Sequence, residues 1–400
     1  MRFRLFTLML LAPLFVFCNK SGDPEDNGNN GNNGGDNPGQ IDPPPADDLA
    51  PQVKDGDVIL VTNATVEKFL TDVSYPEHIY TETHIRDEVY APTCPGSGQD
   101  KPQSYTIRWN ADASAGVPTA RLWEDDGWSR TYTSLAAGDS YLTISNMRPN
   151  AQYHYEVKAG DKVLTSGSFK TTGHVHQLFF AKNVRNCRDL GGWKTKDGTK
   201  TVKYRKIYRG GRLEPEQLKT SGKNDILAEG IRAQLDLRGT SDVLSESPFP
   251  DWNTSGYFCA PVIEEGYTQL LKDDQAKARQ CFEFIAKCVH DGKPVYFHCS
   301  LGRDRTGTVA MMVLGILGVN EGDISKEYEL TQFAPNGWAT SEGESQKMTR
   351  KANYAYKDAA TYIWNTPCEG TEFADHMEAY LLSIGISKST IDQFRSEMLE

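Results

Sequence analysis

The feature that most constrains the fold is an apolar strand joined to an apolar helix by a short polar loop, within residues 295–317. Residues 295–298 read Val-Tyr-Phe-His and are apolar enough to be buried on both faces of a parallel sheet. Residues 308–317 predict a buried helix. A parallel strand followed by a helix is typical of α/β domains, so further strands and crossover helices are expected nearby.

Two earlier segments supply these elements. Residues 231–238 predict a second strand, and residues 275–290 predict a crossover helix because their apolar side chains recur at helical spacing: Ala278, Cys281, Phe282, Ile285 and Val289. We therefore expect residues 174–400 to form an α/β domain around a central, mostly parallel sheet.

The chain before residue 174 has a different pattern. Short alternating segments, such as residues 104–109 and 141–144, are divided by turn residues and predict antiparallel strands. A chain of 400 residues also exceeds what one hydrophobic core usually serves. We therefore expect residues 53–173 to fold as a separate unit of antiparallel strands.

The N-terminus has the layout of a bacterial export signal. Arg2 and Arg4 precede an apolar run over residues 5–17 that is too short to span a membrane, and Cys18 follows. We expect residues 1–17 to be a signal peptide and Cys18 to be lipidated, which would anchor an exported protein to the outer-membrane, periplasmic or cell-surface side. An ordinary secretory signal or a buried apolar start is the alternative. Residues 18–52, rich in Asn, Gly, Asp and Pro, predict a flexible tether.

Composition excludes several classes of protein. The net charge is −11 and no run of Lys and Arg offers a basic surface, so nucleic acid is not an expected partner. No Walker loop or dinucleotide fingerprint occurs in the sequence. His174 and His176 stand two residues apart without companion ligands at metal spacing. We expect neither a metal nor a cofactor.

The polar loop, residues 298–307, carries the candidate chemistry and is called the cysteine loop below. Five residues separate Cys299 from Arg305, enough for a loop whose backbone N–H groups converge on a phosphate. The following helix adds its positive N-terminal end. The field that binds phosphate also favours the thiolate, so Cys299 is the expected nucleophile.

The other loop residues have expected roles of their own. Arg305 can grip two phosphate oxygens with its planar fork. Gly302 lets the backbone approach the ligand, and the Thr306 hydroxyl can support the sulfur as a leaving group. Ser300, Leu301 and Arg303 complete the expected substrate-binding loop. His298 is expected to point away from the pocket and to brace the loop by hydrogen bonds.

This loop matches the protein tyrosine phosphatase signature His-Cys-x5-Arg-Thr at every fixed position. It resembles most the tyrosine phosphatase-like family of secreted bacterial enzymes, whose loop usually reads Cys-x-x-Gly-Lys-Asp-Arg-Thr-Gly. Arg303 stands here in place of the lysine. Further motifs of that family are similar to residues 186–192, 208–213, 236–238 and 317–319, so the resemblance covers roughly residues 183–400.

The resemblance implies a phosphatase that acts on phosphotyrosine and, in several members, on phosphoserine, phosphothreonine or phosphoinositides. It leaves the general acid open. Asp304, inside the loop, is the first choice, and Asp236 at a strand end is the alternative, since no Trp-Pro-Asp acid loop occurs. Asp189, Arg188 and Arg238 are expected to form ion pairs near the pocket floor, with direct substrate contact as the alternative.

The N-terminal strands carry a second resemblance. Residues 147–157 are similar to the tyrosine-corner strand of a fibronectin type III domain, and residues 167–172 to its last strand. The implied fold is an immunoglobulin-like sandwich, which serves as a spacer or as a contact surface for protein or glycan.

Taken together, the cysteine loop and the family motifs predict a phosphatase acting through a phosphocysteine. A module that only binds phosphate or sulfate, and a cell-surface adhesion protein, are the alternatives.

Overall fold

The computed structural model describes residues 49–71, 100–181, 184–239, 246–253, 256–259, 263, 265–334 and 350–400. The expected signal peptide, Cys18 and nearly all of the tether lie outside the described residues. Residues 49–400 form one compact unit, in which residues 49–173 are called the N-terminal part and residues 174–400 the α/β part. None of the helices in these described stretches is long and apolar enough to cross a membrane.

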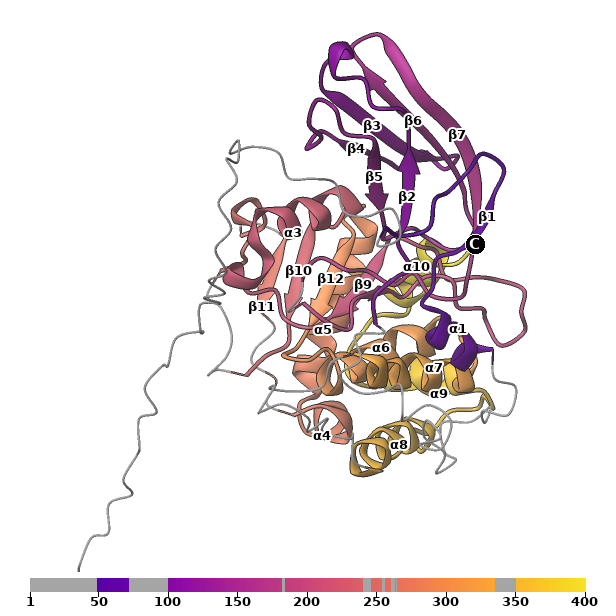
Figure 1. Ribbon diagram of the computed structural model, residues 1–400. Helices are drawn as coiled ribbons and strands as arrows, with labels where there is room; N and C mark the ends of the chain where they lie inside the picture. Colours follow the sequence, from indigo (N-terminus) through magenta and orange to yellow (C-terminus); the bar gives the residue numbers. More distant parts are fainter. Residues whose placement is uncertain are drawn as a thin grey trace, which may run out of the picture. The chain divides into compact units, whose positions relative to one another are not determined.

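A central sheet organises the α/β part (Figure 1). Among the described residues it has five strands in the order β11-β10-β12-β9-β8. Pairing is parallel except between β8 and β9. The strands are β8 (Arg188–Asp189), β9 (Ile207–Gly210), β10 (Ala233–Asp236), β11 (Tyr257–Cys259) and β12 (Val295–His298). The two strands expected from the sequence are β10 and β12, and they are neighbours.

Helices cover both faces of this sheet. Leu235 and Phe297 face a large core formed with α5 and α6, whereas Tyr208 and Tyr296 face a smaller core formed with α3. The helices are α3 (Pro215–Glu229), α4 (Tyr267–Lys272), α5 (Gln275–His290), α6 (Asp304–Ile316), α7 (Glu321–Glu329), α8 (Arg350–Trp364), α9 (Phe373–Ser383) and α10 (Lys388–Met398), with the 3-10 turns η3 (Pro250–Trp252) and η4 (Leu330–Phe333). The result is an α/β arrangement of three layers.

Helix α5 has the bounds expected from its apolar spacing, but α6 begins four residues before the expected start at Thr308. The Gly307 N–H donates to the Arg303 carbonyl at 2.7 Å, and the Thr308 hydroxyl donates to the Asp304 carbonyl at 2.9 Å. The apolar run marks only the buried body of the helix, whereas its polar first turn faces the loop. Arg305 therefore lies in the first turn of α6.

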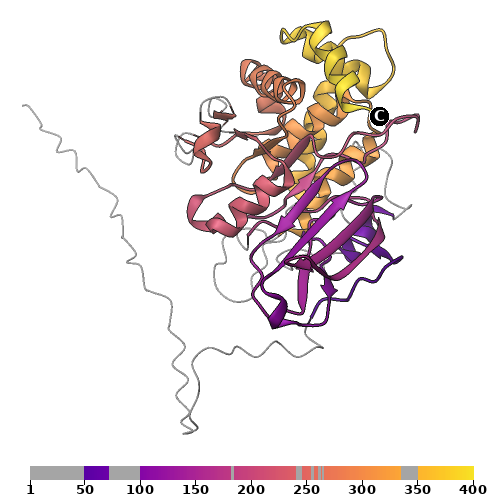
Figure 2. The same ribbon diagram turned by 90° about the horizontal axis from the view of Figure 1, so that it is seen from above.

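The N-terminal part is rich in strands (Figures 1 and 2). Its described strands form two sheets, β1-β7-β6-β3-β4 and β2-β5. Tyr153 lies in their shared core, its ring 5.4 Å from that of Phe169, and its hydroxyl accepts the Arg148 N–H at 2.8 Å. The strands are β1 (Val58–Leu60), β2 (Tyr105–Arg108), β3 (Pro118–Glu124), β4 (Ser129–Tyr132), β5 (Tyr141–Ile144), β6 (Gln152–Ala159) and β7 (Lys162–Thr172).

A short helix that the sequence analysis did not predict, α1 (Ala64–Leu70), leaves the N-terminal part and joins the α/β core. Its Phe69 ring lies 5.5 Å from the ring of Phe333, and the Lys326 ammonium donates to the Leu70 carbonyl at 3.0 Å. Seven residues are too few for a helical repeat to stand out from the sequence alone. Helix α1 thus packs on the α/β part.

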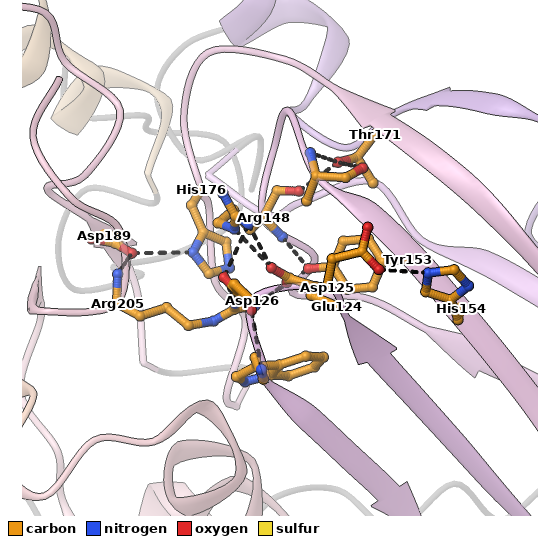
Figure 3. Close-up of polar contacts among 12 residues, drawn as sticks. Glu124, Asp125, Asp126, Arg148, Tyr153, His154, Thr171, His176, Asp189 and Arg205 are labelled. Carbon is orange, nitrogen blue, oxygen red and sulfur yellow. Dashed lines mark hydrogen bonds and ion pairs between the residues drawn. The ribbon is translucent and has the colours of Figure 1, made fainter. Parts of the chain in front are cut away.

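A buried set of charged and polar side chains also joins the two parts; we call Glu124, Arg148, Tyr153, His176, Asp189, Arg205 and Glu229 the interface cluster, and Figure 3 labels all of these except Glu229. Glu124, at the end of β3, is only 2% exposed and pairs with Arg205 at 2.6 Å and Arg148 at 2.8 Å. Burial alone would raise the pKa of Glu124, but the two guanidinium groups and the Tyr153 hydroxyl lower it to about 2. The carboxylate is therefore charged inside the interface.

His176 lies on the α/β side of the interface cluster and is fully buried. Its ring nitrogens lie 3.4 Å from Asp189 and 3.7 Å from Glu229, and Nε2 also lies 2.9 Å from the Asn146 carbonyl. Burial alone would lower the pKa of His176, but Glu229 and Asp189 outweigh it and raise the pKa above its ordinary value. The carboxylates of the cluster thus favour the imidazolium form of His176.

Replacing Glu124 should test how much this interface stabilises the fold. We expect Glu124→Gln to lower the free energy of unfolding by about 3–5 kcal/mol, because both guanidinium groups lose the buried carboxylate that they share. Asp126→Asn is the matched control, since Asp126 pairs with Arg148 at 3.1 Å but is half exposed. It should cost about 0–1 kcal/mol. Urea unfolding of the full chain measures both, and equal losses would contradict the expectation.

Candidate active site

The cysteine loop lies where three neighbouring parallel strands end. Cys299 follows β12, Gly211 follows β9 and Leu237 follows β10, and the last residues of these strands are paired in register. In open α/β sheets this carboxyl edge is the usual place for a binding site. The end of β12 thus sets the position of Cys299, independently of the contacts that the loop makes.

Hydrogen bonds tie the carbonyl groups of the cysteine loop away from its centre. The Asn186 side-chain amide donates to the carbonyls of Gly302 at 2.8 Å and Leu301 at 3.3 Å, and Arg209 also donates to Gly302. The Arg212 N–H donates to the Ser300 carbonyl at 3.2 Å. Because the N–H and C=O of a peptide point in opposite directions, these ties turn successive N–H groups towards the middle of the loop.

Gly302 is required for this loop on two grounds. Its φ of +71° lies in the left-handed region, which side chains with a Cβ rarely adopt. A Cβ there would also lie within 3.0 Å of the Gly210 backbone. The residue expected to allow close approach of a ligand therefore also allows close approach of β9.

Cys299 is 3% exposed, and the surroundings of its thiol favour the thiolate. Burial alone would raise the pKa, but the positive charge of Arg305 and the nearby Thr306 hydroxyl and N–H outweigh it and lower the pKa of Cys299 below its ordinary value. The buried Thr306 hydroxyl has no other hydrogen-bond partner among the described residues, so it can donate to the Cys299 sulfur. Arg305 itself donates to the carbonyls of Ile263 at 3.0 Å and Leu237 at 3.5 Å.

His298 braces the base of the loop and is fully buried. Its Nδ1 lies 3.1 Å from the Cys299 carbonyl, and its Nε2 lies 2.8 Å from the Gln234 amide nitrogen. The other end of that amide accepts the Ser247 hydroxyl, so the nitrogen end donates to His298. Burial lowers the pKa of His298, which fits a neutral ring that donates from Nδ1.

Asp304 lies at the mouth of the loop with its side chain about one-third exposed. It pairs with Arg303 at 2.7 Å and accepts a hydrogen bond from the Tyr267 hydroxyl, which is 2.6 Å from that of Tyr328. Tyr267 was missed by the sequence analysis, since no local pattern marks it. Its φ of +59° and the hydrogen bond from its N–H to Thr308 at 2.7 Å turn it onto the first turn of α6.

The other expected pocket residues are buried in ion pairs. Asp236 is fully buried and pairs with Arg238 at 2.7 Å, and Arg238 also pairs with Glu214. Burial alone would raise the pKa of Asp236, but neighbouring positive charge outweighs it and lowers the pKa. Asp189 lies away from the loop, in the interface cluster, where it accepts the N–H groups of Arg205 at 2.6 Å and Gly191 at 2.8 Å.

Two residues that hold the loop were not singled out from the sequence, although both lie in the family-like motifs. Asn186, in residues 186–192, donates to the loop carbonyls. Arg209, in residues 208–213, is fully buried and pairs with Glu327 at 2.8 Å, as does Arg188 at 2.7 Å. Cys187, between Asn186 and Arg188, is a free buried thiol, and burial raises its pKa to about 12.

Among the described residues, no group of three or more His, Cys, Asp or Glu is arranged to hold a metal ion.

The influence of Arg305 on the thiol can be measured directly. We expect Arg305→Gln to shift the alkylation of Cys299 by iodoacetamide to higher pH, because the thiolate loses its nearest positive charge. The measurement is the alkylation rate between pH 4 and pH 10, about the range in which thiols titrate, with the labelled peptide identified by mass spectrometry. Arg303→Gln is the control and should shift the curve less, since Asp304 already pairs with Arg303. Equal shifts would contradict this assignment.

Comparisons with known proteins agree with the phosphatase signature of the cysteine loop. The model of the tyrosine phosphatase family matches residues 180–400, more than half of the chain. A protein of Cupriavidus necator, named for tyrosine-protein phosphatase activity, is 22% identical over 246 residues, which cover 56% of this chain and 85% of that protein. The tyrosine-protein phosphatase of Nostoc commune is 28% identical over 192 residues, covering 43% and 59%. The chain belongs to the tyrosine phosphatase family and is a phosphatase, a phosphoric monoester hydrolase.

Proposed function

We propose that this phosphatase transfers the phosphoryl group of its substrate to Cys299 and then to water. The observation that carries the proposal is a buried thiol of lowered pKa at the base of a loop whose Ser300, Leu301 and Gly302 carbonyls are held from outside the loop. The inward N–H groups of Ser300, Leu301, Gly302 and Arg303 would bind the phosphate oxygens. Arg305 would add two charge-assisted hydrogen bonds.

The reaction has two steps. In the first, the Cys299 thiolate attacks phosphorus, an S–P bond forms, and the P–O bond to the leaving group breaks while an acid protonates the leaving oxygen. In the second, water attacks phosphorus, the S–P bond breaks, and the same group, now a base, accepts the proton of the water. The thiolate is restored, with the Thr306 hydroxyl supporting it.

We assign the acid role to Asp304 rather than to Asp236. Asp304 is partly exposed at the mouth of the loop, whereas Asp236 is fully buried and paired with Arg238. A proton donor must reach the leaving oxygen. The ion pair between Arg303 and Asp304 has to open for this, and a bound phosphate offers Arg303 another anion.

The substrate class proposed is a phosphotyrosine protein, because both relatives are named tyrosine-protein phosphatases. Phosphoserine, phosphothreonine and phosphoinositides are the other phosphomonoesters to be tested.

We propose two further features, which concern the chain outside the α/β part. The N-terminal part is a fibronectin type III-like sandwich, which the hydrogen bond of the Tyr153 hydroxyl supports. The chain is exported and anchored to a membrane through a lipid on Cys18.

The nucleophile is tested by Cys299→Ser. We expect this variant to lose turnover of p-nitrophenyl phosphate while it still binds vanadate or phosphate, because the loop N–H groups and Arg305 remain. Vanadate should inhibit the unchanged protein and EDTA should not. Turnover that survives in Cys299→Ser would reject the phosphocysteine, and loss of activity with EDTA would point to a metal mechanism.

The acid is tested by Asp304→Asn with two leaving groups. We expect kcat/KM for phosphotyrosine, which reports the first step, to fall by about 10²- to 10⁴-fold, the usual contribution of a general acid. The loss for p-nitrophenyl phosphate should be much smaller, since nitrophenolate leaves without a proton. Asp236→Asn provides the comparison. Equal losses of Asp304→Asn on both substrates would contradict the assignment.

A further inference from the structure

Asn186 connects the cysteine loop to the N-terminal part. Its side-chain amide donates to the Gly302 carbonyl at 2.8 Å and to the Thr331 hydroxyl at 3.2 Å. Its own backbone N–H donates to the Asp100 carboxylate at 2.7 Å. Asn186 is 1% exposed and has a left-handed φ of +60°, so its backbone keeps this conformation only if its surroundings hold it.

Asp100 belongs to the N-terminal part and is held from both sides. Its backbone N–H donates to the Phe333 carbonyl at 3.1 Å, next to α7. Five residues later, Tyr105 begins β2 and its hydroxyl donates to the Leu60 carbonyl at 2.7 Å, at the end of β1. Asp100 is half-buried, and this burial raises the pKa of its carboxyl despite the hydrogen bond from the Asn186 N–H.

The interface cluster provides a second connection to the same segment (Figure 3). Glu124 pairs with Arg205, and the Arg205 N–H donates to Asp189 at 2.6 Å. Arg188 directly precedes Asp189 in β8. Its side chain lies on the other face of the strand, where it binds Glu327 and Asn186. Both connections therefore end on residues 186–189, the segment that holds the loop carbonyls.

We propose that the N-terminal part is a working part of the phosphatase, with Asp100 as a positioning residue that holds Asn186 and thereby orients the N–H groups of the cysteine loop. Without the Asp100 carboxylate, the buried Asn186 N–H loses its acceptor. The left-handed turn at Asn186 then loses one of its supports, and its side-chain amide holds the Leu301 and Gly302 carbonyls less firmly, so the Gly302 and Arg303 N–H groups are less well directed inward. This inference rests on the proposed role of Cys299.

The test uses the full chain with Asp100→Ala and Asp57→Ala. Asp57 is the matched control, because its carboxylate also accepts one backbone N–H at 2.7 Å, from Lys54, in an exposed turn of the same part. We expect Asp100→Ala to lower kcat for p-nitrophenyl phosphate by about tenfold, the loss of roughly one charged hydrogen bond. It should also shift Cys299 alkylation to higher pH. Asp57→Ala should change neither quantity.

Asp100→Asn separates positioning from folding, since it keeps an acceptor oxygen for the Asn186 N–H. It should recover most of the kcat and the original alkylation curve. If Asp100→Ala does not fold, Asp100→Ser takes its place with the same expectations. The proposal is overturned if the folded Asp100→Ala or Asp100→Ser variant matches the unchanged protein in both measurements, or if Asp100→Asn loses as much as they do.

The two proposals fail in different ways. Alkylation needs no turnover, so it tests Asp100 even if Cys299→Ser keeps its activity. A normal alkylation curve in Asp100→Ala, beside an inactive Cys299→Ser, would reject the positioning role and leave the phosphocysteine intact.

Discussion

The active site depends on the hydrogen bonds that tie the carbonyls of the cysteine loop outward. An isolated loop of this length would expose its N–H and C=O groups in many directions. Asn186, Arg209 and the Arg212 N–H bind the carbonyls of Ser300, Leu301 and Gly302, and this leaves the N–H groups to face the centre. The pKa of Cys299 is lowered chiefly by the charge of Arg305, with help from the Thr306 hydroxyl and N–H, and the ordered loop fixes these groups relative to the sulfur.

This arrangement requires charges to be buried beneath the loop. Arg188 and Arg209 share the carboxylate of Glu327, and all three side chains are almost fully buried. Buried charges are unfavourable unless they are paired and hydrogen-bonded, and here each guanidinium group also binds an oxygen of the loop or of Asn186. The ion pairs thus contribute orientation, which a purely apolar floor could not supply.

Buried side chains also connect the N-terminal part to the α/β part. Its strands have a core of their own, yet α1 adds Phe69 to the core of the α/β part and Glu124 enters a buried set of charges with Arg205. Such contacts differ from those of a flexibly attached spacer, in which few side chains cross the boundary. The α/β part and the N-terminal part thus form one compact unit.

Local spacing and residue type were enough to predict the strand β12, the helix α5, the cysteine loop with its Gly302, and the family. That Asn186, Arg209 and Tyr267 meet the loop, and that Asp189 faces the N-terminal part instead, is visible only in the folded molecule. Those partners lie far from the loop in sequence, and their roles follow from which strands become neighbours. A pattern along one chain cannot specify a hydrogen bond between segments that only folding brings together.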